Sequence, residues 1–141
     1  MPFHIKPFLT LPLASCLLIA FLVLCSGPAY AEWVLVGESQ SGTTIYVDPD
    51  TIRRKGDLVK IWELFDYKTA KTVNGVSSLS FKAQRQFDCA EERSRGLVFT
   101  EFSGNMGNGS AVFTDSTEQK WGPVAPDSVD QSLWKIACDK K

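Results

Sequence analysis

SLSFKAQRQFDC, residues 78–89, carries the clearest structural signal in the chain, because apolar and polar side chains alternate along it. Successive side chains of a β-strand point to opposite faces of the sheet, so this alternation predicts a strand with one buried face. The predicted buried face carries Leu79, Phe81, Ala83, Phe87 and Cys89, and the opposite face carries Ser80, Lys82, Gln84, Gln86 and Asp88. We therefore expect a half-buried strand here.

The segments on both sides of this strand also have the composition of strands. Upstream, residues 33–37 and 43–47 are apolar or β-branched runs separated by turn residues, which is typical of a hairpin, and residues 58–67 form a longer run. Downstream, residues 96–103 and 110–114 indicate two more strands. Consecutive strands with turn signals between them favour an antiparallel meander of about six strands.

The C-terminal segment changes from the period of strands to the period of a helix. Pro126 ends the preceding loop, and Ser128 and Gln131 have the spacing of a capping box. Apolar residues then recur at three- and four-residue intervals, namely Val129, Leu133, Ile136 and Ala137. We expect a short amphipathic helix packed on one face of the sheet, so the predicted fold class is α+β.

Residues 1–31 have the features of a secretory signal peptide that is removed. An apolar run over residues 8–25 is followed by a helix-breaking stretch and then by the small-x-small pattern that signal peptidase accepts. Cleavage after Ala31 makes Glu32 the new N-terminus. The remaining residues 32–141 contain no repeat or linker and are expected to form a single exported domain.

Two alternatives to removal are a retained membrane anchor and a lipid anchor. The apolar run nearly reaches the roughly 20 residues that span a bilayer, but Pro7, Pro12 and the cleavage site favour removal, so we expect no membrane span in the mature protein. Lipidation at Cys16 is disfavoured because it would leave the apolar residues 17–24 at the start of the mature chain. Export to the periplasm, the cell surface or the medium is the expectation.

The mature segment is close to neutral. The full chain has 15 Lys and Arg residues against 16 Asp and Glu residues, and removal of residues 1–31 takes away one lysine and leaves a net charge of −2. Nucleic-acid binding relies on clustered basic residues that neutralise phosphates. The sequence therefore excludes nucleic acid as the expected partner.

Cys89 and Cys138 are the cysteines that remain after Cys16 and Cys25 leave with the signal peptide. An even pair in an oxidising compartment predicts a disulfide within the chain. Closing a loop of about 50 residues is worth about 4 kcal/mol of stability in the chain-entropy model. Because Cys138 lies in the last turn of the predicted helix, the bond is expected to attach the helix to the sheet.

The sequence lacks the residue types that most catalytic sites need. The only histidine, His4, lies in the segment to be removed, which excludes Ser-His and Cys-His nucleophile systems and imidazole-based metal sites. Asp48 with Asp50 and Glu91 with Glu92 are carboxylate pairs, but a capped turn and a solvated connection explain them better. We expect no enzyme activity, no cofactor and no metal site.

Two loops offer weaker signals. The glycine-rich residues 104–109 lack the lysine and hydroxyl residue of a phosphate-binding loop and lead into a strand, so a flexible hairpin is expected. Arg53-Arg54-Lys55 forms a compact basic turn. A solvated turn is the simpler interpretation, and an interaction with acidic glycans or acidic partner loops is the alternative.

The mature chain resembles the surface-adhesin protein E family of exported bacterial proteins over nearly its whole length. The resemblance is carried by Trp33-Val34, Tyr46-Val47-Asp48, Trp62, Asp66-Tyr67, Phe87-Asp88-Cys89, Ser103-Gly104, and Trp121 through Pro126, Ser128, Trp134 and Cys138. It implies an antiparallel sheet with a C-terminal helix. It also implies attachment to host extracellular-matrix proteins, which is the role of the best-known member.

Two functional hypotheses follow. The first is a non-catalytic binding or adhesion module of the cell envelope, whose partner is a protein such as an extracellular-matrix protein or a second copy of the chain. The second is a periplasmic structural or carrier protein that holds a small apolar ligand or caps an envelope complex.

The third predicted strand suggests where a partner would bind. Large apolar side chains point to both of its faces, and one short helix covers only one face. The other face is closed by curling of the sheet, by a loop or by another molecule. If it stays open, Trp62 or Tyr67 is the predicted anchor of an interface, because aromatic residues concentrate binding energy.

Overall fold

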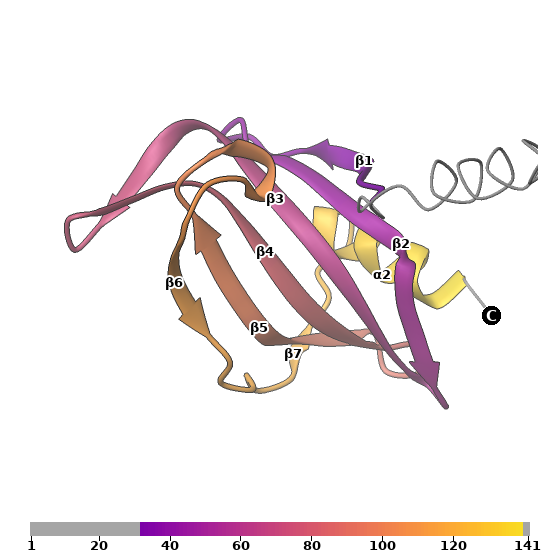
Figure 1. Ribbon diagram of the computed structural model, residues 1–141. Coiled ribbons are helices and arrows are strands. Elements are labelled where there is room, and N and C mark those ends of the chain that lie inside the picture. The colour runs from indigo at the N-terminus through magenta and orange to yellow at the C-terminus, as the bar shows by residue number, and fades with distance from the viewer. Residues whose placement is uncertain (1–31, 140–141) are drawn as a thin grey trace, which may run out of the picture. The chain divides into compact units, whose positions relative to one another are not determined.

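The computed structural model describes residues 32–139, which form a curved antiparallel sheet with one helix (Figure 1). The elements are β1 (Val34–Glu38), β2 (Thr44–Lys55), β3 (Leu58–Val73), β4 (Val76–Asp88), β5 (Arg93–Phe102), the 3-10 turn η1 (Asn105–Gly107), β6 (Ala111–Asp115), β7 (Gly122–Pro123) and α2 (Val129–Asp139). Neighbouring strands β1 to β6 pair in chain order, and the short β7 pairs with β5. The predicted six-strand meander with a C-terminal helix is confirmed.

Tight turns connect the central strands. Gly56 has a φ of 62° in the turn between β2 and β3, where Lys55 pairs with Leu58. Asn74 and Gly75 have φ values of 51° and 77° between β3 and β4. Positive φ at both central residues is the requirement of a type I′ hairpin turn, for which Asn-Gly is the preferred sequence. These turns fix the register of β2, β3 and β4.

The second strand, predicted over residues 43–47, is longer than expected, because β2 continues past Asp48-Pro49-Asp50 to Lys55. Its pairing with β3 shifts between Asp48 and Arg53, so the chain bulges there and then resumes pairing. The Asp50 N–H donates to Asp48 Oδ1 at 3.1 Å, which is the capped turn expected of these residues. The bulge absorbs the turn without ending the strand.

We call the face of the sheet that α2 covers the helix face. The core lies there and consists of Ile45, Val47, Val59, Ile61, Phe87, Leu133 and Ala137. A disulfide joins Cys89, just after β4, to Cys138 in the last turn of α2, with 5.6 Å between the Cα atoms. The helix begins as predicted, since the Gln131 N–H donates to Ser128 Oγ at 3.1 Å. The sheet and the helix are therefore joined by both packing and a covalent bond.

We call the opposite side of the sheet the loop face, because the segment that contains η1 covers part of it. The Met106 N–H donates to Asp66 Oδ1 at 2.7 Å, and the Gly107 N–H donates to Ser80 Oγ at 2.8 Å. Leu64 and Ser80 are fully buried beside these contacts. The hairpin predicted at residues 104–109 is present, since β5 pairs with β6, but these bonds hold its loop against the sheet. The prediction that Ser80 lies on an open face was wrong.

The predicted signal peptide, its cleavage site at Ala31 and the lipidation alternative at Cys16 lie outside the described residues. Glu32, the predicted new N-terminus, is the first described residue and is exposed. Within residues 32–139 no helix has the length and apolar character needed to cross a membrane.

Candidate binding surfaces

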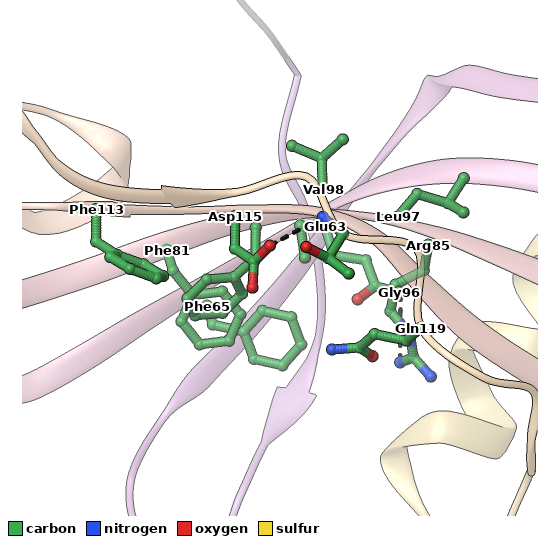
Figure 2. Close-up of a pocket in the computed structure, with 13 residues that line it drawn as sticks. Glu63, Phe65, Phe81, Arg85, Gly96, Leu97, Val98, Phe113, Asp115 and Gln119 are labelled. Atoms are coloured by element: carbon green, nitrogen blue, oxygen red, sulfur yellow. Dashed lines mark hydrogen bonds and ion pairs between the residues drawn. The ribbon is translucent and has the colours of Figure 1, made fainter.

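A cavity of about 380 Å³ opens on the helix face beyond the N-terminal end of α2, where the lining residue Arg85 bonds to Asp130 in the first turn of the helix. It is lined by Glu63, Phe65, Phe81, Ala83, Arg85, Gly96, Leu97, Val98, Phe99, Phe113, Asp115, Thr117 and Gln119. Figure 2 shows the rings of Phe65, Phe81 and Phe113 on one side of the view and Arg85, Gly96 and Gln119 on the other. The cavity therefore has an aromatic wall and a polar wall.

The strand register explains why a hollow forms at this place. Ala83 pairs with Glu63 on one side and with Phe99 on the other, and Phe99 pairs with Asp115. Side chains opposite each other in a sheet share a face, so the small Ala83 side chain lies between larger neighbours. The Phe81 ring stacks on the Phe65 ring at 4.3 Å between centroids and contacts the Phe99 ring at 4.5 Å.

Glu63 is an ionisable group that is 0% exposed, and it also lines the cavity. Neither of its carboxyl oxygens has a hydrogen-bond partner among the described residues. Arg85 Nη1 lies 3.6 Å from Glu63 Oε1, close enough for an ion pair but too far for a hydrogen bond. Burial raises the pKa of Glu63 to about 8, with Arg85 opposing the shift and Asp130 adding to it.

Arg85 directs its hydrogen bonds to other residues. Its Nη1 donates to Asp130 Oδ1, in the first turn of α2, at 2.8 Å, and its Nη2 donates to Ser94 Oγ at 2.6 Å. The Asp130 carboxylate therefore balances the guanidinium charge. A strongly perturbed acid beside a cavity marks this place as a candidate functional site.

A second surface lies on the loop face at the turn between β2 and β3. Arg53 pairs with Lys60, and Lys55 pairs with Leu58. Together with Arg54 and Gln86 these residues line a hollow of about 500 Å³. We call the exposed cations Arg53, Lys55 and Lys60 the basic surface; within residues 32–139 none of them forms a salt bridge.

The segment from Glu91 to Arg95, predicted to be a solvated connection, is exposed only in its first part. Glu91 and Glu92 are exposed, but Arg93 and Arg95 belong to β5. Their guanidinium groups lie 4.6 Å and 4.4 Å from the centroid of the Trp121 ring. The two arginines therefore position the segment that precedes β7.

The predicted anchors Trp62 and Tyr67 lie on different faces of the sheet. Tyr67 is 6% exposed and packs beside Phe81, with Lys71 Nζ 4.1 Å from the centroid of its ring. Trp62 is half-buried on the loop face. The structure does not bring the two rings together, and their role at an interface stays a prediction.

Sequence reasoning missed Glu63 and Arg85 as site residues, although a signal for each was present. Glu63 occupies an inward position between Ile61 and Phe65 in an otherwise apolar face of β3. Arg85 interrupts the apolar face of β4 between Ala83 and Phe87. A charged residue at an inward position of two neighbouring strands predicts a buried ion pair.

The chain matches the family model of the surface-adhesin protein E family over residues 33–139. It belongs to that family. Membership makes it an adhesin-type protein that is exported or displayed at the surface. No curated protein matches the chain.

Solved structures of Haemophilus influenzae protein E have the same fold. The selenomethionine form has a TM-score of 0.61 at 12% identity, with 80% of this chain and 90% of that chain covered. Crystal form II has a TM-score of 0.60 at 12% identity, with 79% and 91% covered. Protein E from the non-typeable organism has a TM-score of 0.56 at 13% identity, with 80% and 79% covered. The resemblance recognised in the sequence is thereby confirmed.

Proposed function

We propose that this protein is a non-catalytic binding module of the cell envelope that attaches to an acidic segment of a protein partner. The family supports an adhesin-type role. The observation that carries the proposal is the basic surface, in which Arg53 and Lys60 are paired directly across two strands.

Two like charges opposite each other in a sheet destabilise the fold. The chain nevertheless places Lys55 beside this pair, on the same face, although its mature segment carries a net negative charge. Arg53 Nη1 donates only to the backbone oxygens of Asp50 and Ile52 in the contacts of the described residues. A surface that concentrates exposed cations attracts an acidic partner and accelerates the encounter with it.

The histidine and cysteine content of the chain supports a role without catalysis. The mature segment has no histidine, and both of its cysteines form the disulfide. Common nucleophilic mechanisms need an imidazole base or a free thiolate. We therefore place the function in binding.

Purified mature protein on a biosensor surface, exposed to a panel of extracellular-matrix proteins, tests the proposal. We expect a partner whose binding weakens as salt is added and weakens more than tenfold in the double variant Arg53→Glu/Lys60→Glu. The matched control is Lys120→Glu/Lys135→Glu, which makes the same charge change at exposed positions elsewhere. Equal losses in both double variants would show that the net charge matters and not the basic surface.

A periplasmic structural or carrier role is the second candidate, and the cavity on the helix face is the observation that favours it. The location of the protein in the cell envelope distinguishes the adhesion role from the periplasmic role. Digestion by protease added to intact cells supports adhesion, whereas release by osmotic shock without such digestion supports the periplasmic role.

A further inference from the structure

The inner end of the cavity contains polar atoms without a partner. Burying a carboxyl group without hydrogen bonds costs free energy, and buried polar groups in folded proteins are nearly always satisfied. Both carboxyl oxygens of Glu63 depart from this pattern among the described residues. Arg85 Nη1 lies 3.6 Å from Glu63 Oε1 but donates its hydrogen bond to Asp130 instead. A donor entering from the cavity would satisfy the Glu63 oxygens once the side chains that now keep water from them move aside.

We propose that the cavity binds a small organic amine, with its ammonium group against Glu63 and its apolar body against Phe65, Phe81 and Phe99. This goes beyond attachment to a protein partner. It gives the carrier role a class of ligand, and binding of a free amine can be measured wherever the protein resides.

The charges around the cavity favour a cation over an anion. The positive charge of Arg85 is balanced by Asp130, whose Oδ1 lies 2.8 Å from Arg85 Nη1. Asp115 lines the cavity opposite Phe99, and a hydrogen bond from the Thr117 N–H lowers its pKa, which keeps it ionised. Glu63 and Asp115 are therefore the carboxyl groups without a cationic partner at hydrogen-bond distance in the described part of the wall.

The aromatic wall suits the same ligand. An ammonium group is attracted to the face of an aromatic ring, and this attraction is stronger where water is excluded. The stacked rings of Phe65 and Phe81 also offer apolar surface to an alkyl or phenyl body. A volume of about 380 Å³ lies within the range of small-molecule sites, so the expected ligand is a compact monoamine.

The protonation of Glu63 sets the pH dependence of binding. The groups that face it are Arg85 from β4, Asp130 from α2 and, across the cavity, Asp115 from β6. With a pKa of about 8, Glu63 is mostly a neutral acid at pH 7. An ammonium ion must displace its proton, so we expect proton release on binding and an affinity that rises more than tenfold from pH 6 to pH 8.

The experiment is a titration of the isotope-labelled mature protein, followed by NMR, with benzylamine, benzyl alcohol and benzoate at pH 8. These probes share one ring and differ in charge. We expect benzylamine at millimolar concentration to shift the amide signals of Ala83 and Phe99. Its affinity should exceed that of the alcohol and of benzoate by at least tenfold.

Two variants separate recognition of charge from filling of the hollow. Glu63→Gln should weaken the binding of benzylamine at least tenfold and leave the binding of benzyl alcohol unchanged. Ala83→Leu should abolish the binding of both probes, because the larger side chain fills the cavity. The amide spectrum of each variant shows whether it is folded. Absence of benzylamine shifts in the wild type, equal binding of amine and alcohol, or full amine affinity in Glu63→Gln would each overturn the proposal.

Discussion

The two ends of the helix face use the same strands for opposite purposes. At the end covered by α2, Ile61 and Phe87 are completely buried against Leu133. Two residues along β3, Glu63 is equally buried but lines a cavity. Burial alone therefore does not define the core, because one end excludes water with apolar packing and the other encloses an ionisable group.

The two ends of the helix face differ because different segments of the chain cover them. At the first end α2 supplies an apolar stripe, and the disulfide holds it against the end of β4. At the second end β6 and the segment after it supply Asp115, Thr117 and Gln119, which are polar and exposed. The helix end has the composition of a stabilising core, and the cavity end has that of a binding site.

The largest effect is expected from removing the covalent attachment at the helix end. The double variant Cys89→Ser/Cys138→Ser should lower the free energy of unfolding by about 4 kcal/mol, because the bond constrains a loop of about 50 residues in the unfolded chain. Chemical denaturation of the oxidised wild type and of the variant measures the difference. A loss below about 1 kcal/mol would mean that packing alone holds the helix.

A leucine exchange compares packing at the two ends directly. Leu133→Ala should cost about 3 kcal/mol, because the side chain is completely buried and its removal leaves a hole in the core. Leu97→Ala, at the partly exposed wall of the cavity, should cost less than about 1 kcal/mol. Similar losses in both variants, measured by urea denaturation, would contradict the distinction.

At the cavity end we expect stability to depend on pH through Glu63. Because the pKa of Glu63 rises from 4.5 to about 8 on folding, the folded state holds more protons than the unfolded state between these values. Stability from this group is fully present below pH 4.5 and is lost as the pH rises toward 8.

Glu63→Gln removes that titration and keeps the shape of the side chain. Between pH 5 and pH 8 the wild type should therefore lose on the order of 3 kcal/mol more than the variant does. Denaturant unfolding at a series of pH values gives both curves. Parallel curves would show that Glu63 keeps an ordinary pKa in the folded protein.

The strands and the helix were predictable because their signals are local. Alternation in residues 78–89 and the apolar spacing from Val129 to Ala137 need no knowledge of the rest of the chain. The capping residues Ser128 and Gln131 also mark the helix start within a few positions of each other.

The remaining features depend on contacts between distant segments. The cavity exists because Glu63, Ala83 and Phe99 are aligned across three strands, and this register follows from bulges and turns elsewhere. The segment around Thr117 has no strand or helix pattern that would place it over the hollow. The docking of Met106 on Asp66 joins residues forty positions apart, and so it too was not foreseen.

The amine site requires Glu63 to be a buried acid at the inner end of the cavity, and its raised pKa makes this acid mostly neutral at pH 7. Its side-chain carboxyl carbon, identified by the signal that disappears in Glu63→Gln, reports its protonation directly in a carbon-13 NMR titration of the protein. We predict a midpoint near pH 8. A midpoint near 4.5, the ordinary pKa of a glutamate, would show that Glu63 is ionised at pH 7 in the folded protein.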